Sequence, residues 1–162
     1  MAKQKIRAGV VGFGISAKVF HLPFITTLPG LYELVSILQR EGNEAKMQFP
    51  QAKIVRTIEE IVSDPDVDLV VITTPNDTHF PYTKMALEAG KHVVLEKPFT
   101  NTIEEAEQLV DIAARSGKVL SVYQNRRYVS DFRTIKQILD NKLLGNVLEF
   151  EAHYDRYRAE ES

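Results

Sequence analysis

The feature that most constrains the fold is a regular alternation of short apolar runs with longer amphipathic stretches. The runs are rich in valine, isoleucine and leucine, and they occupy residues 6–12, 32–38, 68–73, 92–96 and 118–123, with a shorter one at 53–55. Near-continuous apolar runs of this length are typical of strands buried on both faces of a parallel sheet. The alternation therefore predicts an α/β fold with a doubly wound parallel sheet, because right-handed crossovers place helices on both faces.

Residue patterns at the ends of the amphipathic stretches predict where helices begin and stop. Thr57 and Glu60 have the spacing of a capping box. Residues 81–90 open with proline and close with glycine, which suits a helix start and a helix end. Residues 102–117 open with threonine before acidic side chains and also close with glycine.

The pattern changes after residue 123. Residues 130–145 predict a linking helix that ends near residues 141–145. Residues 146–158 alternate apolar and polar side chains as a half-exposed strand does. We therefore expect two parts. Residues 1–123 form the parallel-sheet domain, and residues 124–162 form a linker helix and the first strand of a second, mostly missing α/β domain.

Composition narrows the classes of function. The chain has 162 residues, with 20 basic and 22 acidic side chains and a net charge of −2. This balance gives no electrostatic case for binding nucleic acid or an anionic membrane. The sequence contains no cysteine, which excludes disulfides and thiolate chemistry. No apolar run is long enough to span a bilayer, so we expect a soluble, cytoplasmic protein.

A glycine-rich turn follows the first predicted strand. Gly12, Gly14 and Ala17 fit the pattern G-x-G-x-x-A, with Ile15 and Ser16 between the last two. The first glycine permits a tight turn, the second lets the backbone approach a pyrophosphate, and the small third residue lets a helix pack close to the strand. This position predicts dinucleotide binding, with a purely structural turn as the alternative.

The end of the second predicted strand bears on which dinucleotide is bound. An acidic residue there usually holds a ribose 2′-hydroxyl, but this chain has Gln39 and Arg40. The missing acid argues against strict NAD preference and against S-adenosylmethionine. Arg40 suits a 2′-phosphate, which favours NADP over NAD. The alternative is a solvated arginine beside Glu41 and Glu44.

Polar residues follow the next strands at the edge where ligands sit in open α/β sheets. Thr74, Pro75 and Asn76 are candidates for a backbone wall over a ribose and nicotinamide. His79 either reaches the cleft or has a structural role, such as capping the helix that starts at Pro81. Lys97 stands at the end of its strand, where it could hydrogen-bond a substrate oxygen and help to move its proton, or could be a surface charge. The step from Lys97 to the following proline is also a candidate cis peptide bond.

Together these segments resemble a known family. The stretches "GVVGFGISAKVFHLPFI", "VITTPNDTHF", "HVVLEKPFT" and "YQNRRY", in this order and spacing, are similar to those of the Gfo/Idh/MocA family of NAD(P)-dependent oxidoreductases. The resemblance implies a Rossmann domain and reversible hydride transfer between a nicotinamide cofactor and a sugar, polyol or related hydroxyl carbon. It further implies that Lys97, in the E-K-P motif, contacts the reacting hydroxyl and assists proton transfer.

The resemblance also implies roles for other residues. The matched positions are the cofactor loop (Gly12, Gly14, Ala17), the cofactor cleft (Asn76, His79, Glu96) and the segment beside the nicotinamide and substrate (Asn125, Arg126).

One departure from the family pattern stands out, since the D-x-x-x-H motif of the family's substrate domain does not occur in this sequence. We therefore expect this chain to bind cofactor but to turn over slowly or not at all, and expect the full-length protein to form a homo-oligomer. A non-catalytic nucleotide-binding sensor or interaction module is the alternative function.

Overall fold

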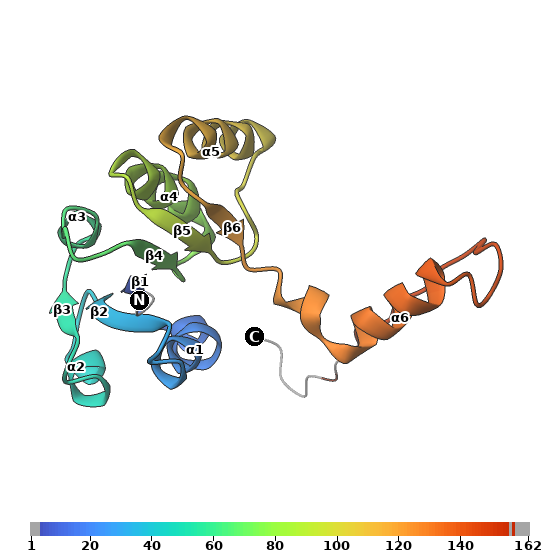
Figure 1. The fold of residues 1–162 in the computed structure, drawn as a ribbon, viewed down its shortest axis with the longest axis horizontal. Coiled ribbons are helices and arrows are strands. Elements are labelled where there is room, and N and C mark those ends of the chain that lie inside the picture. The colour runs from blue at the N-terminus through green and yellow to red at the C-terminus, as the bar shows by residue number, and fades with distance from the viewer. Residues whose placement is uncertain (1–3, 156, 158–162) are drawn as a thin grey trace. The chain divides into compact units, whose positions relative to one another are not determined.

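A parallel sheet of six strands organises the first part of the chain, in the order β3-β2-β1-β4-β5-β6 (Figure 1). The computed structural model describes residues 4–155 and residue 157. The strands are β1 (Ile6–Val11), β2 (Tyr32–Leu38), β3 (Lys53–Val55), β4 (Leu69–Ile72), β5 (His92–Leu95) and β6 (Leu120–Val122). Every adjacent pair is parallel. The doubly wound α/β fold predicted from the apolar runs is confirmed.

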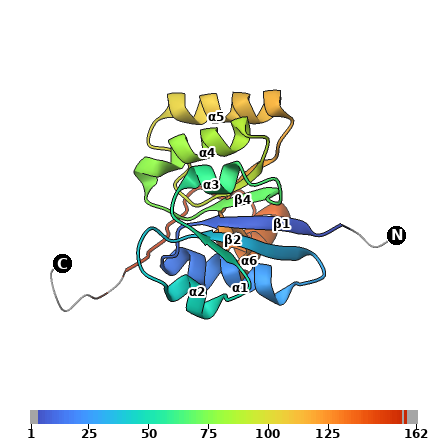
Figure 2. The ribbon, with the colours of Figure 1, turned by 90° about the vertical axis from the view of Figure 1, so that its left-hand side faces the viewer.

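Helices cover both faces of this sheet (Figure 2). They are η1 (Ala17–His21), α1 (Leu22–Thr27), α2 (Glu44–Gln48), α3 (Ile58–Val62), η2 (Asn76–Thr78), α4 (His79–Glu88) and α5 (Ile103–Ser116). Figure 2 shows α1 and α2 on one side of the strands and α3, α4 and α5 on the other. Each side has its own cluster of buried apolar side chains, as expected of strands that are apolar on both faces.

The helix ends agree with the sequence signals in two cases and differ in one. Thr57 and Glu60 form the predicted capping box. The Thr102 side chain accepts a hydrogen bond from Glu105 N at 3.2 Å at the start of α5. The helix expected to begin at Pro81 begins instead at His79. Proline is tolerated there because the first-turn N–H groups have no partner within the helix.

The strand register aligns the carboxyl ends of neighbouring strands in one row. The last residue of β1, Val11, pairs with the last residues of β2 and β4, Leu38 and Ile72. Ile72 pairs in turn with Leu95, and Leu95 with Val122. The residues that follow each strand therefore meet along one edge, hereafter the carboxyl edge. The strand order reverses between β1 and β4, which is where open α/β sheets bind ligands.

The chain divides into two compact units between Gln124 and Asn125. The second contains η3 (Asn125–Tyr128) and α6 (Ser130–Asp140). The predicted linking helix is thus present, and its C-cap, Asn141, lies at the near end of the range 141–145 expected for its stop. Residues 146–155 form no strand, contrary to our expectation, because no described segment pairs with them. Residues 156 and 158 of the expected strand lie outside the described residues. No described helix is long and apolar enough to cross a membrane.

Candidate functional site at the carboxyl edge of the sheet

The glycine-rich loop leaves β1 at the carboxyl edge and has the geometry of a cradle. Gly12 has a φ of +102°, and a Cβ atom there would lie 2.9 Å from Thr73 Oγ1. Gly14 has no heavy atom within 4 Å of the position its Cβ would take, so its backbone is open to a ligand. Ala17 is completely buried, as the predicted close helix packing requires. These three positions fit the pyrophosphate of a dinucleotide, and the neighbouring Ile15 is 79% exposed.

The helix after the glycine loop contains a π-turn, which places the side chains of Ser16 and His21 beside the same carboxylate, that of Glu96. Leu22 N–H donates to Ala17 O, five residues back, at the end of η1. A π-turn brings residues five apart onto the same face, whereas an α-helix would separate them. Ser16 Oγ and His21 Nε2, five residues apart, both contact Glu96 Oε1, the latter at 2.9 Å.

Glu96 is therefore a buried junction between η1 and the end of β5. Its side chain is 10% exposed and that of His21 is 5% exposed. Glu96 Oε2 also accepts from Lys97 N at 3.1 Å. Burial raises the pKa of Glu96, but the hydrogen bonds from Ser16 and His21 outweigh it and hold that pKa below its ordinary value.

Tyr123, just beyond β6, packs against the His21 ring next to Glu96. Its ring lies 4.3 Å from the His21 ring, centroid to centroid, and its hydroxyl donates to Phe20 O at 3.1 Å. Burial, together with the negative charge of Glu96, raises the pKa of the Tyr123 hydroxyl. The ends of β5 and β6 are thus fastened to the helix that follows the glycine loop.

The loop after β4 lies at the same edge. Thr78 Oγ1 donates to Pro75 O at 2.6 Å and contacts Thr74 Oγ1 at 2.6 Å, which fixes the loop's shape. Asn76 is exposed at the start of η2. His79 is 1% exposed, with Nδ1 2.7 Å from Pro98 O and Nε2 3.0 Å from Thr74 O. It therefore ties the loop after β4 to the segment after Lys97, which is the structural role left open by the sequence.

Lys97 follows Glu96 directly and is exposed at the carboxyl edge. The Lys97–Pro98 peptide bond is cis. The Glu96 carboxylate holds the backbone N–H of Lys97, so the buried junction fixes the chain from which the lysine extends. A cation at this position can hydrogen-bond the oxygen of an alcohol or a carbonyl.

The remaining predicted residues fall into two groups. Arg40 is exposed just past the end of β2, at the same edge as the glycine loop. Asn125 and Arg126 lie in η3, in the second unit, so their place at the site stays a prediction.

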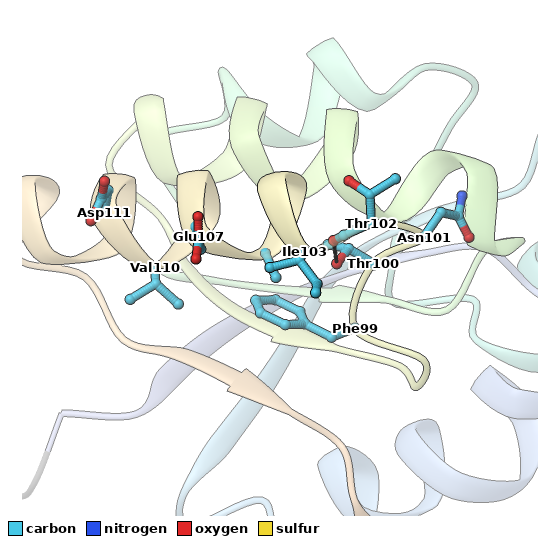
Figure 3. Close-up of a pocket in the computed structure, with 9 residues that line it drawn as sticks. Phe99, Thr100, Asn101, Thr102, Ile103, Glu107, Val110 and Asp111 are labelled. Atoms are coloured by element: carbon cyan, nitrogen blue, oxygen red, sulfur yellow. Dashed lines mark hydrogen bonds between the residues drawn. The ribbon is translucent and has the colours of Figure 1, made fainter.

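A pocket of about 730 Å³ lies elsewhere, beside the first turns of α5 (Figure 3). Phe99, Ile103 and Val110 give it an apolar floor, and Glu107 and Asp111 line it from α5. Two carboxylates disfavour a phosphate-bearing ligand. The glycine loop at the carboxyl edge is therefore a better candidate for a dinucleotide site than this pocket.

Two residues with clear roles at the edge were not singled out from the sequence. The role of His21 could not be predicted, because His21 and Ser16 share the acceptor Glu96 only through the π-turn, and the 3.6-residue period of an α-helix does not predict such a turn. A histidine inside the apolar stretch "AKVFHLPF" was the available signal. Arg56, which holds the loop after β2, makes only tertiary contacts to backbone and loop atoms and leaves no local pattern.

Comparison with known proteins shows the family of the chain. Residues 6–124 match the family GFO_IDH_MocA, described as an oxidoreductase family with an NAD-binding Rossmann fold. The oxidoreductase YdgJ of Escherichia coli, of uncharacterized function, is 47% identical over 155 residues, covering 96% of this chain and 44% of YdgJ. The scyllo-inositol 2-dehydrogenase (NADP(+)) IolW of Bacillus subtilis is 42% identical, covering 96% of this chain and 43% of IolW.

Solved structures agree with the sequence comparison. The structure of yvaA from Bacillus subtilis superposes with a TM-score of 0.91 at 41% identity, covering 98% of this chain and 46% of that chain. The chain thus spans less than half the length of these relatives. Because the family match covers most of the sequence and the loop geometry agrees with it, the chain belongs to the Gfo/Idh/MocA family of oxidoreductases, with an NAD-binding Rossmann fold.

Proposed function

We propose that this chain is the cofactor-binding part of an oxidoreductase that transfers a hydride between a nicotinamide dinucleotide, NADP(H) in preference to NAD(H), and a sugar- or polyol-like alcohol or ketone. The observation that carries the proposal is the convergence of the open glycine loop and Lys97 at one edge of the sheet, held together by Glu96. The relative IolW, by its name an NADP(+)-dependent dehydrogenase of scyllo-inositol, supports both the cofactor and the substrate class.

The glycine loop binds the pyrophosphate in this proposal. The backbone at Gly14 is open, and the helix that follows presents free N–H groups and its positive dipole end to an anion. Ile15 and Ser16 supply those amides, while the Ser16 side chain is already engaged by Glu96. Thr74, Pro75 and Asn76 form the wall toward the nicotinamide ribose, and Arg40 pairs with the 2′-phosphate.

Lys97 acts on the substrate. When bound, the nicotinamide ring accepts or donates the hydride. In alcohol oxidation, Lys97 Nζ hydrogen-bonds the substrate oxygen and assists the departure of its proton, and in reduction it assists the return of that proton. Glu96 and His79 keep the segment Lys97–Pro98 in place through its backbone.

The test of the cofactor preference is calorimetric titration of this chain with NADPH and, separately, NADH. We expect tighter binding of NADPH, and we expect Arg40→Ala to weaken NADPH about tenfold, the loss of a charge-assisted contact. NADH binding should change little in that variant. Equal affinity of the wild-type chain for both dinucleotides would contradict the NADP preference, and binding of neither would contradict the proposal itself.

A further inference from the structure

The loop between β2 and α2, residues 39–43, is bound by an arginine that follows the neighbouring strand, β3. Arg56 follows the last residue of β3 directly. Its Nη1 donates to Gln39 O at 2.6 Å and to Gly42 O at 2.9 Å, and its Nη2 donates to Asn43 Oδ1 at 3.2 Å. One guanidinium group therefore binds acceptors at the start of the loop (Gln39) and at its end (Gly42 and Asn43).

Other contacts fasten the same loop. Gln39 N donates to Val55 O at 3.1 Å, and Gln39 Oε1 accepts from Ala45 N at 2.8 Å at the start of α2. Gly42 has a φ of +78°, a conformation that favours glycine. The loop thus has a defined shape on the carboxyl edge, next to the end of β2.

Arg40 is the cation in this loop that remains available. It is exposed, and within the described residues its side chain makes no hydrogen bond or salt bridge. Its acidic neighbours do not pair with it in the described part of the chain. Glu44 is instead held by Lys18 Nζ at 2.7 Å and by Gln48 Nε2 at 3.1 Å. The contacts thus commit Arg56 to the loop backbone and leave Arg40 free for a ligand.

We propose that Arg56 is a specificity-determining positioning residue, which fixes the loop so that Arg40 meets the 2′-phosphate of NADPH. This inference rests on the proposed function. The planar guanidinium reaches several acceptors at once, whereas a lysine ammonium is a compact charge on a flexible stem and lacks this fork. Arg56 therefore acts by geometry, and its charge alone is not sufficient.

Titration of NADPH and NADH into the wild-type chain and three variants tests this role. In Arg56→Ala and Arg56→Lys alike, we expect NADPH affinity to fall about tenfold, since an ordered charge-assisted contact at Arg40 is lost. NADH affinity should stay within about twofold of wild type, because NADH carries no phosphate for Arg40. The matched control is Arg115→Ala, which removes an exposed arginine in the last turn of α5 and should change neither affinity. Thermal unfolding of each variant reports its stability.

The ratio of the two affinities separates the possible outcomes. An Arg56→Lys variant that binds NADPH as wild type does would overturn the proposal, because charge alone would then suffice. Equal weakening of NADPH and NADH would also overturn it, since that result indicates a general loss of structure. If Arg40→Ala lowers NADPH affinity selectively while both Arg56 variants are neutral, this inference fails and the proposed function stands. No preference in the wild-type chain would contradict both.

Discussion

Each edge of the sheet holds a pair of polar side chains that joins elements distant in sequence, but the two pairs are built differently. The opposite edge, where the strands begin, is called the amino edge. There, Arg7 in β1 binds Asp68 through both Nε and Nη2, at 3.0 and 2.9 Å, and the two side chains are 29% and 35% exposed. At the carboxyl edge, His21 binds Glu96 at 2.9 Å with side chains 5% and 10% exposed. The first pair is partly solvated and uses a permanently charged arginine. The second is buried and uses a histidine.

The difference follows from what each edge has to do. At the amino edge the Arg7–Asp68 pair joins β1 to the start of β4, and both side chains stay in partial contact with water. At the carboxyl edge the pair connects the segment of Lys97 to the helix after the glycine loop, and burial makes His21 and Glu96 dependent on each other. We therefore expect the two pairs to differ in how much stability they contribute and in what disturbs them.

The largest expected effect is that of Glu96→Ala. Removing this carboxylate leaves the buried His21 ring, and the partly buried Ser16 hydroxyl and Lys97 N–H, without their partner. The free energy of unfolding should fall by about 2–3 kcal/mol, measured by urea unfolding at neutral pH. Glu107→Ala, at an exposed glutamate of α5, is the matched control and should stay within about 0.5 kcal/mol of wild type. If the free energy of unfolding of Glu96→Ala falls as little as that of the control, the carboxyl edge does not depend on its buried pair and the contrast between the two edges is wrong.

The two pairs should also respond differently to a fall in pH. The ordinary pKa is 4.5 for Glu96 and 3.8 for Asp68, and in the folded protein the pKa of each group lies below that value. A carboxyl group with a depressed folded-state pKa stabilises the fold above its unfolded-state pKa, and this stabilisation is lost as the pH falls. The loss should begin near pH 4.5 at the carboxyl edge and only near pH 3.8 at the amino edge. Urea unfolding of Glu96→Gln should therefore depend less on pH around 4.5 than wild type does. An unchanged pH dependence in that variant would show that Glu96 is not the group responsible.

The smallest expected effect is that of Asp68→Ala at the amino edge. The loss of stability should be smaller than for Glu96→Ala, because water partly replaces the lost partner of Arg7. It should shrink further in about 1 M salt, where the Debye length falls to about 3 Å, whereas the loss for Glu96→Ala should persist. Urea unfolding at low and high salt measures both. Equal salt dependence of the two variants would contradict the contrast in burial.

The sequence predicted the sheet well and the junction at Glu96 poorly, for a physical reason. Apolar runs such as residues 68–73 signal a buried parallel strand by themselves, because burial on both faces imposes the composition. Strand ends then place Gly12 and Lys97 at one edge without further information. Ser16 and His21 share the acceptor Glu96 only because a π-turn places them on one face of the helix. The contacts of Arg56 form only when the neighbouring loop, residues 39–43, is in place. Neither depends on a local pattern, so both become visible only in three dimensions.

The central claim is that the glycine loop at the carboxyl edge binds the pyrophosphate of a nicotinamide dinucleotide. Gly14 and Gly30 offer a matched pair, because a Cβ atom would meet nothing within 4 Å at either position, and neither has a positive φ that would strain a side chain. Gly14 lies in the loop, and Gly30 lies in the turn before β2, at the amino edge.

Calorimetric titration of NADPH into Gly14→Val and Gly30→Val is therefore the most direct measurement. Both variants should keep the melting temperature of the wild-type chain. Gly14→Val should lose NADPH binding by more than about tenfold because its side chain occupies the path of the pyrophosphate, while Gly30→Val should bind as wild type does. Unchanged binding in Gly14→Val, or an equal loss in both variants, would contradict the claim.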